Sequence, residues 1–269
     1  MTRICNRLNK SRAAYYKQQL VYVHKQIQEP ILRELVMEQR KDMPRLGGRK
    51  IYNEIQLAMQ DHQLKMGRDK LFEWLKANDL LVRPKRQYAR TTNSSHRFRV
   101  HENLLMKESI NRPDQAWVCD ITYLRLTKGF CYLALITDVY SRKIIGYHVN
   151  DTLELKGCLK AFEMACKNRN TLQKTIHHSD RGIQYCSNAY VNLLRQKNIL
   201  ISMAETGNCY ENAIAERVNG ILKDEFNLDA TFNTIEQAKR ASEQAVRTYN
   251  TRRPHMSIGM RKPAELYAA

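Results

Sequence analysis

Residues 116–124 have the sequence AWVCDITYL, which places a single acid, Asp120, within an otherwise uncharged run rich in apolar and β-branched residues. A run of this kind predicts a buried strand. An isolated carboxylate is costly to bury, because its charged form loses the surrounding water. Something must therefore compensate the charge of Asp120, which makes this residue the first candidate for a functional site.

The sequence around this run predicts a sheet. Three strands are expected at 116–124, 130–139 and 143–149, with turns at 127–129 and 141–142. Strands joined by such short connections must be antiparallel neighbours. A helix at 155–166, a strand at 175–179, a helix at 189–196 and a strand at 200–203 are predicted to follow. Three strands and then alternating helix and strand indicate a mixed α/β sheet of five strands.

Two more acids occupy positions typical of functional sites. Asp180 ends the fourth strand and is followed by Arg181 and Gly182, so it lies where a strand opens into a loop, as the sites of α/β sheets do. Glu216 lies in a predicted amphipathic helix over residues 210–223. The apolar stripe of that helix is Ile214, Val218, Ile221 and Leu222, and its polar face carries Asn212, Glu216, Asn219 and Lys223.

These three acids together suggest a metal site. Without a metal they would repel one another and raise one another's pKa, whereas around two Mg²⁺ ions they would serve as hard oxygen ligands. Taken singly, each acid is more often a solvated or salt-bridged group, and Glu216 alone fits an ordinary helix surface. The combination is more informative, because 59 residues separate Asp120 from Asp180 and 35 separate Asp180 from Glu216.

Several ordered motifs resemble those of a known family. They are Trp117–Tyr123 (WVCDITY), His178–Tyr185 (HSDRGIQY), Gly207–Asn212 (GNCYEN) with Glu216 and residues 223–225 (KDE), and Tyr249-Asn250 with Arg253-Pro254-His255. Residues 43–51 (MPRLGGRKI) and 11–16 (SRAAYY) resemble the N-terminal region of the same family. The family is the second-frame catalytic product of bacterial insertion sequences, whose transposases share the retroviral integrase core. Glu211 stands where Asp is frequent, and Leu46-Gly47-Gly48 replaces the usual Tyr-Gly-Tyr, but neither departure touches the three acids.

The resemblance implies an α/β, ribonuclease H-like integrase catalytic core, with a mixed five-stranded sheet and helices, preceded by an α-helical N-terminal DNA-binding region. It implies that Asp120, Asp180 and Glu216 are catalytic and hold two Mg²⁺ ions, with Mn²⁺ as a substitute. The reaction expected is strand cleavage and strand transfer at the ends of an insertion sequence. Lys223 corresponds to a lysine that grips terminal phosphates in such enzymes, and a solvated helix lysine is the alternative.

The same resemblance indicates partners. We expect double-stranded DNA, both element ends and target, and a homo-oligomer on DNA, because paired end cleavage needs at least two catalytic subunits. The upstream-frame helix-turn-helix product is expected as a fusion or a partner. Two other functions are open from the residues: a catalytically silent DNA-binding regulator of the same fold, and a ribonuclease H-like nuclease. The intact acids disfavour the regulator, and the long basic N-terminal region disfavours the nuclease.

Charge also points to nucleic acid. The chain of 269 residues has a formal net charge of +18, and residues 1–112 hold 24 Lys and Arg against 11 Asp and Glu. A basic surface attracts polyanions, because neutralised phosphates release their counterions. Residues 80–101 contain no acid and suit an extended arm on DNA, with a solvated linker as the alternative. The DNA-binding candidates, besides Lys223, are Arg83, Lys85, Arg86, Arg90, Arg97, Arg99, Arg252 and Arg253.

We therefore predict three parts: a helical, helix-turn-helix-like DNA-binding region at 1–82, a basic linker or arm at 83–112, and the catalytic core with a C-terminal helical element at 113–269. Helical spacing in the first part predicts several short helices with a turn at 66–69, although any helical bundle contains such turns. Seven cysteines without a CxxC pair indicate buried free thiols. No apolar stretch suggests a bilayer span or a secretory signal, so a bacterial cytoplasmic location, with the nucleoid when DNA-bound, is expected.

Overall fold

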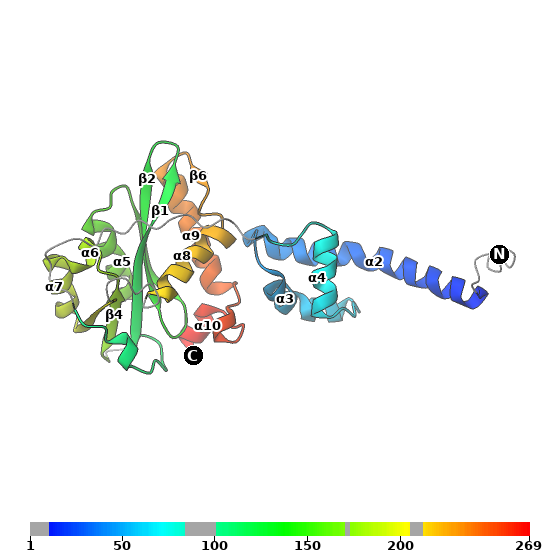
Figure 1. The fold of residues 1–269 in the computed structure, drawn as a ribbon, viewed down its shortest axis with the longest axis horizontal. Helices are drawn as coiled ribbons and strands as arrows, with labels where there is room; N and C mark the ends of the chain where they lie inside the picture. The colour runs from blue at the N-terminus through cyan, green and yellow to red at the C-terminus, as the bar shows by residue number, and fades with distance from the viewer. Residues whose placement is uncertain (1–10, 84–100, 170–172, 205–211) are drawn as a thin grey trace. The chain divides into compact units, whose positions relative to one another are not determined.

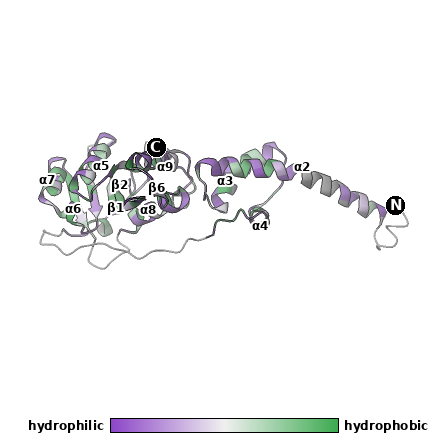
Figure 2. Cartoon of the chain, turned by 90° about the horizontal axis from the view of Figure 1, so that it is seen from above, coloured by the Kyte–Doolittle hydropathy of each residue, from purple (hydrophilic) through white to green (hydrophobic). Residues whose placement is uncertain are grey.

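The structure, a computed structural model, describes residues 11–83, 101–169, 173–204 and 212–269. It divides into two compact units, Met1–Val82 and Arg83–Ala269, here called the N-terminal and C-terminal units. Figure 1 draws both units, and Figure 2 shows hydrophobic and hydrophilic residues mixed along the helices of each. In the part of the chain that is described, no helix is both long enough and apolar enough to cross a membrane.

The described part of the N-terminal unit contains three helices: α2 (Arg12–Asp42), α3 (Gly48–Asp61) and α4 (Arg68–Ala77). Their core contains Leu32, Val36, Ile51, Ile55, Leu71 and Leu75, each at most 2% exposed. The prediction of short helices is wrong for α2, which has 31 residues and continues past Pro30. The segment after the proline packs on α3 through Leu32 and Val36, so tertiary contacts outweigh the helix-breaking tendency of proline there.

The C-terminal unit is built on one mixed sheet. Its strands are β1 (Ala116–Leu126), β2 (Phe130–Asp138), β3 (Ile144–Asn150), β4 (Thr175–Ser179), β5 (Ile199–Met203) and β6 (Thr231–Phe232). The order is β3-β2-β1-β4-β5, and β6 pairs with β1. The predicted antiparallel pairing of the first three strands is confirmed, whereas β4 and β5 run parallel to β1. The sheet has a sixth strand that was not predicted, because two residues are too short for a period-two pattern.

Helices cover both faces of this sheet (Figure 1). They are α5 (Leu155–Lys167), α6 (Ile183–Cys186), α7 (Asn188–Gln196), α8 (Ala213–Glu225), α9 (Ile235–Thr251) and α10 (Pro263–Ala268), with short 3₁₀ turns at Leu105–Lys107 and Met256–Ile258. One core joins Trp117 and Cys119 to Phe162 and Tyr190, and the other joins Leu124 and Leu133 to Val218 and Tyr249. Layers of helix, sheet and helix therefore hold β1 at the centre of the unit.

The segment that precedes β1 packs on the far edge of the sheet. The amide of Met203 donates to the carbonyl of Glu102, and the amide of Leu104 donates to Ser202 Oγ at 2.9 Å. Leu104 and Leu105 also pack on a small apolar cluster that includes Val118 and Ile176. Residues 102–105, which the sequence placed in a basic linker, are thus an integral part of the C-terminal unit.

Candidate active site

Two of the three acids, Asp120 and Asp180, lie at the same level on two neighbouring strands. In the parallel pair β1 and β4, Cys119 is opposite Ser179. The residue that follows each is an acid, Asp120 within β1 and Asp180 directly after β4. Neighbouring strands lie about 4.8 Å apart, so the two backbones hold these acids side by side at the point where β4 ends. Both side chains are half-buried.

Asp120 is held by hydrogen bonds from two directions. Its Oδ1 accepts from the amide of Ile121 at 2.9 Å, and its Oδ2 accepts from Asn219 Nδ2 at 2.7 Å. A second amide of the same region, Asn212 Nδ2, donates to the carbonyl of Cys119 at 3.2 Å. Both asparagines are buried although they are polar. The polar face of α8 therefore lies against β1 at Asp120, and the amides of Ile121 and Asn219 supply the compensation that the half-buried acid requires.

Asp180 is fixed by the turn that it begins. Its Oδ1 accepts from the amide of Gly182 at 3.0 Å. A Cβ added to Gly182 would lie 3.0 Å from that oxygen, so this close turn favours glycine. The guanidinium of the next residue, Arg181, donates to the carbonyl of Ala204 at 2.8 Å. The loop thus holds the carboxylate at the strand end that the sequence indicated.

Glu216 lies in the first turn of α8, and its amide donates to the carbonyl of Asn212 at 3.1 Å. An acid in the first turn of a helix is stabilised by the helix dipole. Asn219 follows Glu216 by three positions on the same face and reaches Asp120. The helix that carries Glu216 is thereby fastened to the strand that carries Asp120. Nevertheless, in the described residues no group of three or more His, Cys, Asp or Glu side chains is gathered closely enough to hold a metal ion.

A buried neutral network lies on the other face of β1. His177 Nε2 is 2.9 Å from both Cys119 Sγ and Tyr190 Oη. Burial lowers the pKa of His177 to about 3, so its ring is neutral. The pKa of Cys119 is raised well above its usual value by burial, and further by the charges of Cys158, Asp120 and Asp180. His177 is therefore a packing residue, as is buried His178, which contacts Ser202 Oγ at 2.8 Å.

The cysteines fit the prediction of buried free thiols. The five that are described, Cys119, Cys131, Cys158, Cys166 and Cys186, are free, and all except the half-buried Cys166 are buried. Cys5 and Cys209 lie outside the described residues.

Lys223 is a predicted DNA contact on the helix that also carries Glu216. It is half-buried near the end of α8, and its Nζ lies 4.2 Å from the centre of the Tyr123 ring. Burial lowers its pKa, while Asp120 acts in the opposite direction. A desolvated ammonium next to the acids is well placed to meet a phosphate.

The remaining basic candidates differ in position. Arg83 is exposed and Arg252 is half-buried. Arg253 is only 2% exposed and binds Glu225 through two 2.8 Å hydrogen bonds, so its burial argues against the expected DNA contact. Its neighbour Tyr249 is buried and donates to the carbonyl of Arg142. These contacts pack the C-terminal helical element on the core of the unit. Lys85, Arg86, Arg90, Arg97 and Arg99 lie outside the described residues.

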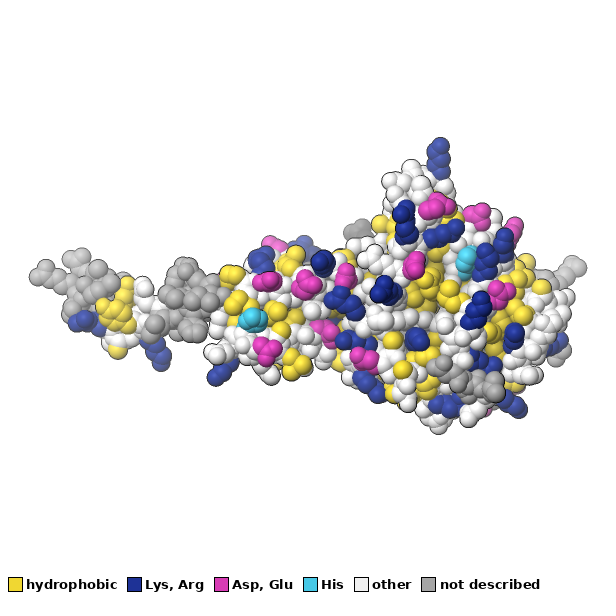
Figure 3. All heavy atoms as spheres, turned by 180° about the vertical axis from the view of Figure 1, so that it is seen from behind, with side chains coloured by type: hydrophobic (Ala, Val, Ile, Leu, Met, Phe, Trp, Pro, Cys, Tyr) yellow, Lys and Arg dark blue, Asp and Glu magenta, His cyan; other side chains and the backbone are white. Residues whose placement is uncertain are grey.

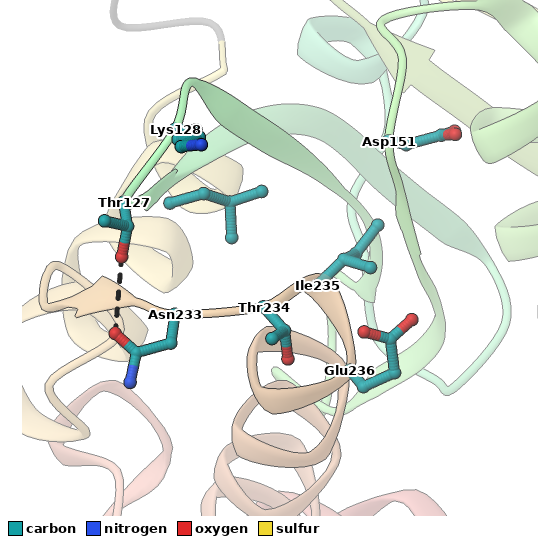
Figure 4. Close-up of a pocket in the computed structure, with 8 residues that line it drawn as sticks. Thr127, Lys128, Asp151, Asn233, Thr234, Ile235 and Glu236 are labelled. Atoms are coloured by element: carbon teal, nitrogen blue, oxygen red, sulfur yellow. Dashed lines mark hydrogen bonds between the residues drawn. The ribbon is translucent and has the colours of Figure 1, made fainter.

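A pocket and a charged surface are also candidate functional features, and neither one indicates a second site. An open pocket of about 550 Å³ lies between the β1–β2 turn and the start of α9, where Thr127 Oγ1 donates to Asn233 Oδ1 at 3.3 Å (Figure 4). Its nearest residue on β1 is Leu126, six positions beyond Asp120. Figure 3 shows Lys and Arg interspersed with acids on the face that it draws, so charge alone does not mark a DNA groove there.

The C-terminal unit, with this sheet and the helix fastened at Asp120, matches models of an integrase core. An "Integrase core domain" model matches residues 110–209, and a second model of that description matches residues 197–263. A simian T-cell lymphotropic virus intasome in complex with PP2A regulatory subunit B56 gamma has a similar fold, with 16% identity and a TM-score of 0.50. That match covers 83% of this chain and 75% of the viral chain.

Similar proteins indicate the family more specifically than the integrase core models do. The chain is 34% identical over 267 residues to "Insertion element IS600 uncharacterized 31 kDa protein" of Shigella sonnei, a match that covers 97% of this chain and 96% of the relative. It is 36% identical over 176 residues to the transposase for insertion sequence element IS629 of the same species, but that match covers only 59% of the transposase. This chain belongs to the family of insertion-sequence transposases with an integrase core.

Proposed function

We propose that this protein cleaves DNA strands at the ends of its insertion sequence and transfers them to target DNA. The observation that carries the proposal is the pairing of β1 with β4, which aligns Asp120 and Asp180, together with the bond from Asn219 that fastens the helix of Glu216 to the same place. Membership of the transposase family supports this function over a silent regulator and over a ribonuclease H-like nuclease.

Asp120, Asp180 and Glu216 are proposed as the ligands of two Mg²⁺ ions, for which Mn²⁺ substitutes. Their donors suit these ions, because all three are carboxylates and Mg²⁺ prefers oxygen ligands. A bound pair of ions would activate a water or a 3′-hydroxyl and stabilise the leaving oxygen of an in-line displacement. Within the described residues the three side chains do not form a group close enough to hold a metal ion, so the proposal rests on their chemistry and on the strand and helix that carry them.

The surrounding residues have separate tasks in this proposal. Asn219 donates to Oδ2 of Asp120 and so orients this carboxylate. Lys223 binds a phosphate next to the scissile bond, where its half-buried ammonium attracts the anion strongly. Arg83 and Arg252 are proposed to contact the DNA backbone, as are the basic residues from Lys85 to Arg99. Arg253 is left out of this set because it is buried against Glu225.

Assembly is part of the same proposal. Two ends must be processed together, so we expect two or more copies of this chain on a pair of DNA ends. The upstream-frame helix-turn-helix product, as a fusion or a partner, stays a prediction.

Glu216→Gln tests the proposed site. It removes one anionic oxygen and keeps the size of the side chain, so strand cleavage should fall at least about a hundredfold while DNA affinity persists. Glu236→Gln is the matched control, because Glu236 lies in the first turn of α9 and is exposed. Wild-type cleavage should need Mg²⁺ or Mn²⁺ and stop with chelator. If Glu216→Gln cleaves within about tenfold of wild type, a barrier change below roughly 1.4 kcal/mol, the assignment of Glu216 is wrong.

A further inference from the structure

Two aromatic rings are exposed on the sheet near the proposed site. Tyr123 on β1 is 38% exposed and Phe130 on β2 is 51% exposed. Their ring centroids are 5.4 Å apart with an interplanar angle of 81°. Neither ring is among the residues that make up the two large cores of the C-terminal unit. Exposed rings of this size lose favourable burial free energy, so their presence on a strand surface suggests a ligand that covers them.

Lys223 links these rings to the acids. Its Nζ lies over Tyr123, which follows Asp120 by three positions on β1, so that the two side chains leave opposite faces of the strand. The charges of Asp120, Arg125 and Asp229 all act on the ammonium of Lys223, which places these side chains in one neighbourhood. Arg125 is exposed and pairs with Phe130 in the β1–β2 register. Aromatic surface and basic groups are thus combined on the β1–β2 hairpin, a few residues beyond Asp120, and Lys223 lies between the two.

We infer that Tyr123 and Phe130 form a stacking platform for an unpaired nucleobase of the DNA strand that this site processes. This inference rests on the proposed function. Every base has a π-face that stacks on an aromatic ring, and basic side chains bind the flanking phosphates. The ammonium of Lys223 would exchange the Tyr123 ring for a phosphate when the strand arrives. A base inside an intact duplex is already stacked on its neighbours, so the ligand is a frayed or single-stranded end.

The test uses the full chain with chelator present, so that no strand is cleaved during binding. Fluorescence anisotropy would compare two duplexes with short single-stranded overhangs, one that carries bases and one whose overhang is abasic but has the same phosphates. Wild type should bind the base-bearing overhang about tenfold more tightly, because only that overhang has bases that can stack on the two rings. Tyr123→Ala and Phe130→Ala should each lose most of this preference, and Tyr123→Phe should keep it.

Leu200→Ala is the matched control, because Leu200 is a 40% exposed apolar residue of the same sheet, on β5, and should leave the preference unchanged. Equal affinity of wild type for both overhangs would overturn the platform, as would a full preference in Tyr123→Ala and Phe130→Ala. A Mg²⁺-dependent cleavage assay of wild type separates the two proposals. Cleavage without a base preference rejects the platform alone, whereas a platform-dependent preference without cleavage rejects the proposed function and retains the platform.

Discussion

Asn219 Nδ2 lies 2.7 Å from Oδ2 of Asp120, although 99 positions separate the two residues in the chain. This hydrogen bond joins α8 to β1, and it holds the Asp120 carboxylate through Oδ2. Because Glu216 precedes Asn219 by three positions, the same bond sets where the helix presents Glu216. The geometry of the proposed site therefore depends on an amide that is not itself one of the three acids.

Removal of that amide should impair catalysis more than stability. Asn219→Ala should lower the rate of strand cleavage about 10- to 100-fold, as loss of a residue that orients a metal ligand commonly does. The Mg²⁺ concentration for half-maximal rate should rise, a change that purely structural damage would not produce. Asn219→Asp should be worse, because it sets a second negative charge against Asp120. Cleavage and its Mg²⁺ dependence that match wild type in Asn219→Ala would exclude this positioning role.

The buried pair Arg253 and Glu225 should contribute to stability. Arg253→Ala removes the two short hydrogen bonds that the buried Glu225 carboxylate accepts, and it should lower the free energy of unfolding by about 3–5 kcal/mol. Arg253→Lys should also destabilise, because an ammonium cannot form the two-pronged contact. Urea denaturation followed by circular dichroism measures the loss, with exposed Arg261→Ala as the control. A variant that keeps wild-type stability but loses DNA affinity would return Arg253 to the DNA-binding residues.

The sequence patterns predicted the strands of the sheet, but they did not predict the contacts around the acids. Strand positions follow from local apolar runs bounded by turns, and the first three strands were found within two residues at each end. The acids stood out because charge is rare in such runs. Asn219 was placed on the polar face of its helix but had no predicted role, since its partner is 99 positions away and pattern does not reveal long-range pairing. The i, i+3 spacing from Glu216 was the available signal.

Two further differences from expectation, at Arg253 and in α2, arise from tertiary packing. Arg253 lies in a basic, aromatic segment that would also suit a DNA surface, and only tertiary packing shows that Glu225 neutralises it. The α2 helix is longer than the short helices that were expected, and it continues past Pro30 although proline is a strong local helix breaker. The sequence shows which charged and apolar side chains are present, but only the fold shows which of these side chains contact one another.

Buried His177 should make the fold sensitive to acid. Its pKa is lowered to about 3 by burial, below the ordinary value near 6.5 of an unfolded chain. The stability that this neutral ring provides is complete above the unfolded pKa and is lost as pH falls toward the folded pKa. Between pH 7 and pH 5, His177 should account for about 2 kcal/mol of lost unfolding free energy.

His177→Asn should therefore be less stable at pH 7 and show a shallower decline with acid. Urea denaturation at the two pH values gives the comparison, and His62→Gln, at an exposed position, is the control. An identical decline in wild type and His177→Asn would contradict the assignment of this pH dependence to His177.

DNA affinity should depend mainly on residues 1–100, which hold 22 Lys and Arg against 9 Asp and Glu, whereas residues 101–269 hold 23 against 18. The proper truncation begins at His101, because residues 102–105 pack on the C-terminal unit and a start at Arg112 would remove them. A protein of residues 101–269 should retain its fold by circular dichroism. It should bind end-containing duplexes more weakly, with a smaller slope of log affinity against log salt, since fewer counterions are released. Filter binding over a range of salt concentrations measures both quantities. Equal affinity and equal slope in the truncated and full-length proteins at matched salt would show that the N-terminal region is not the main DNA-binding part.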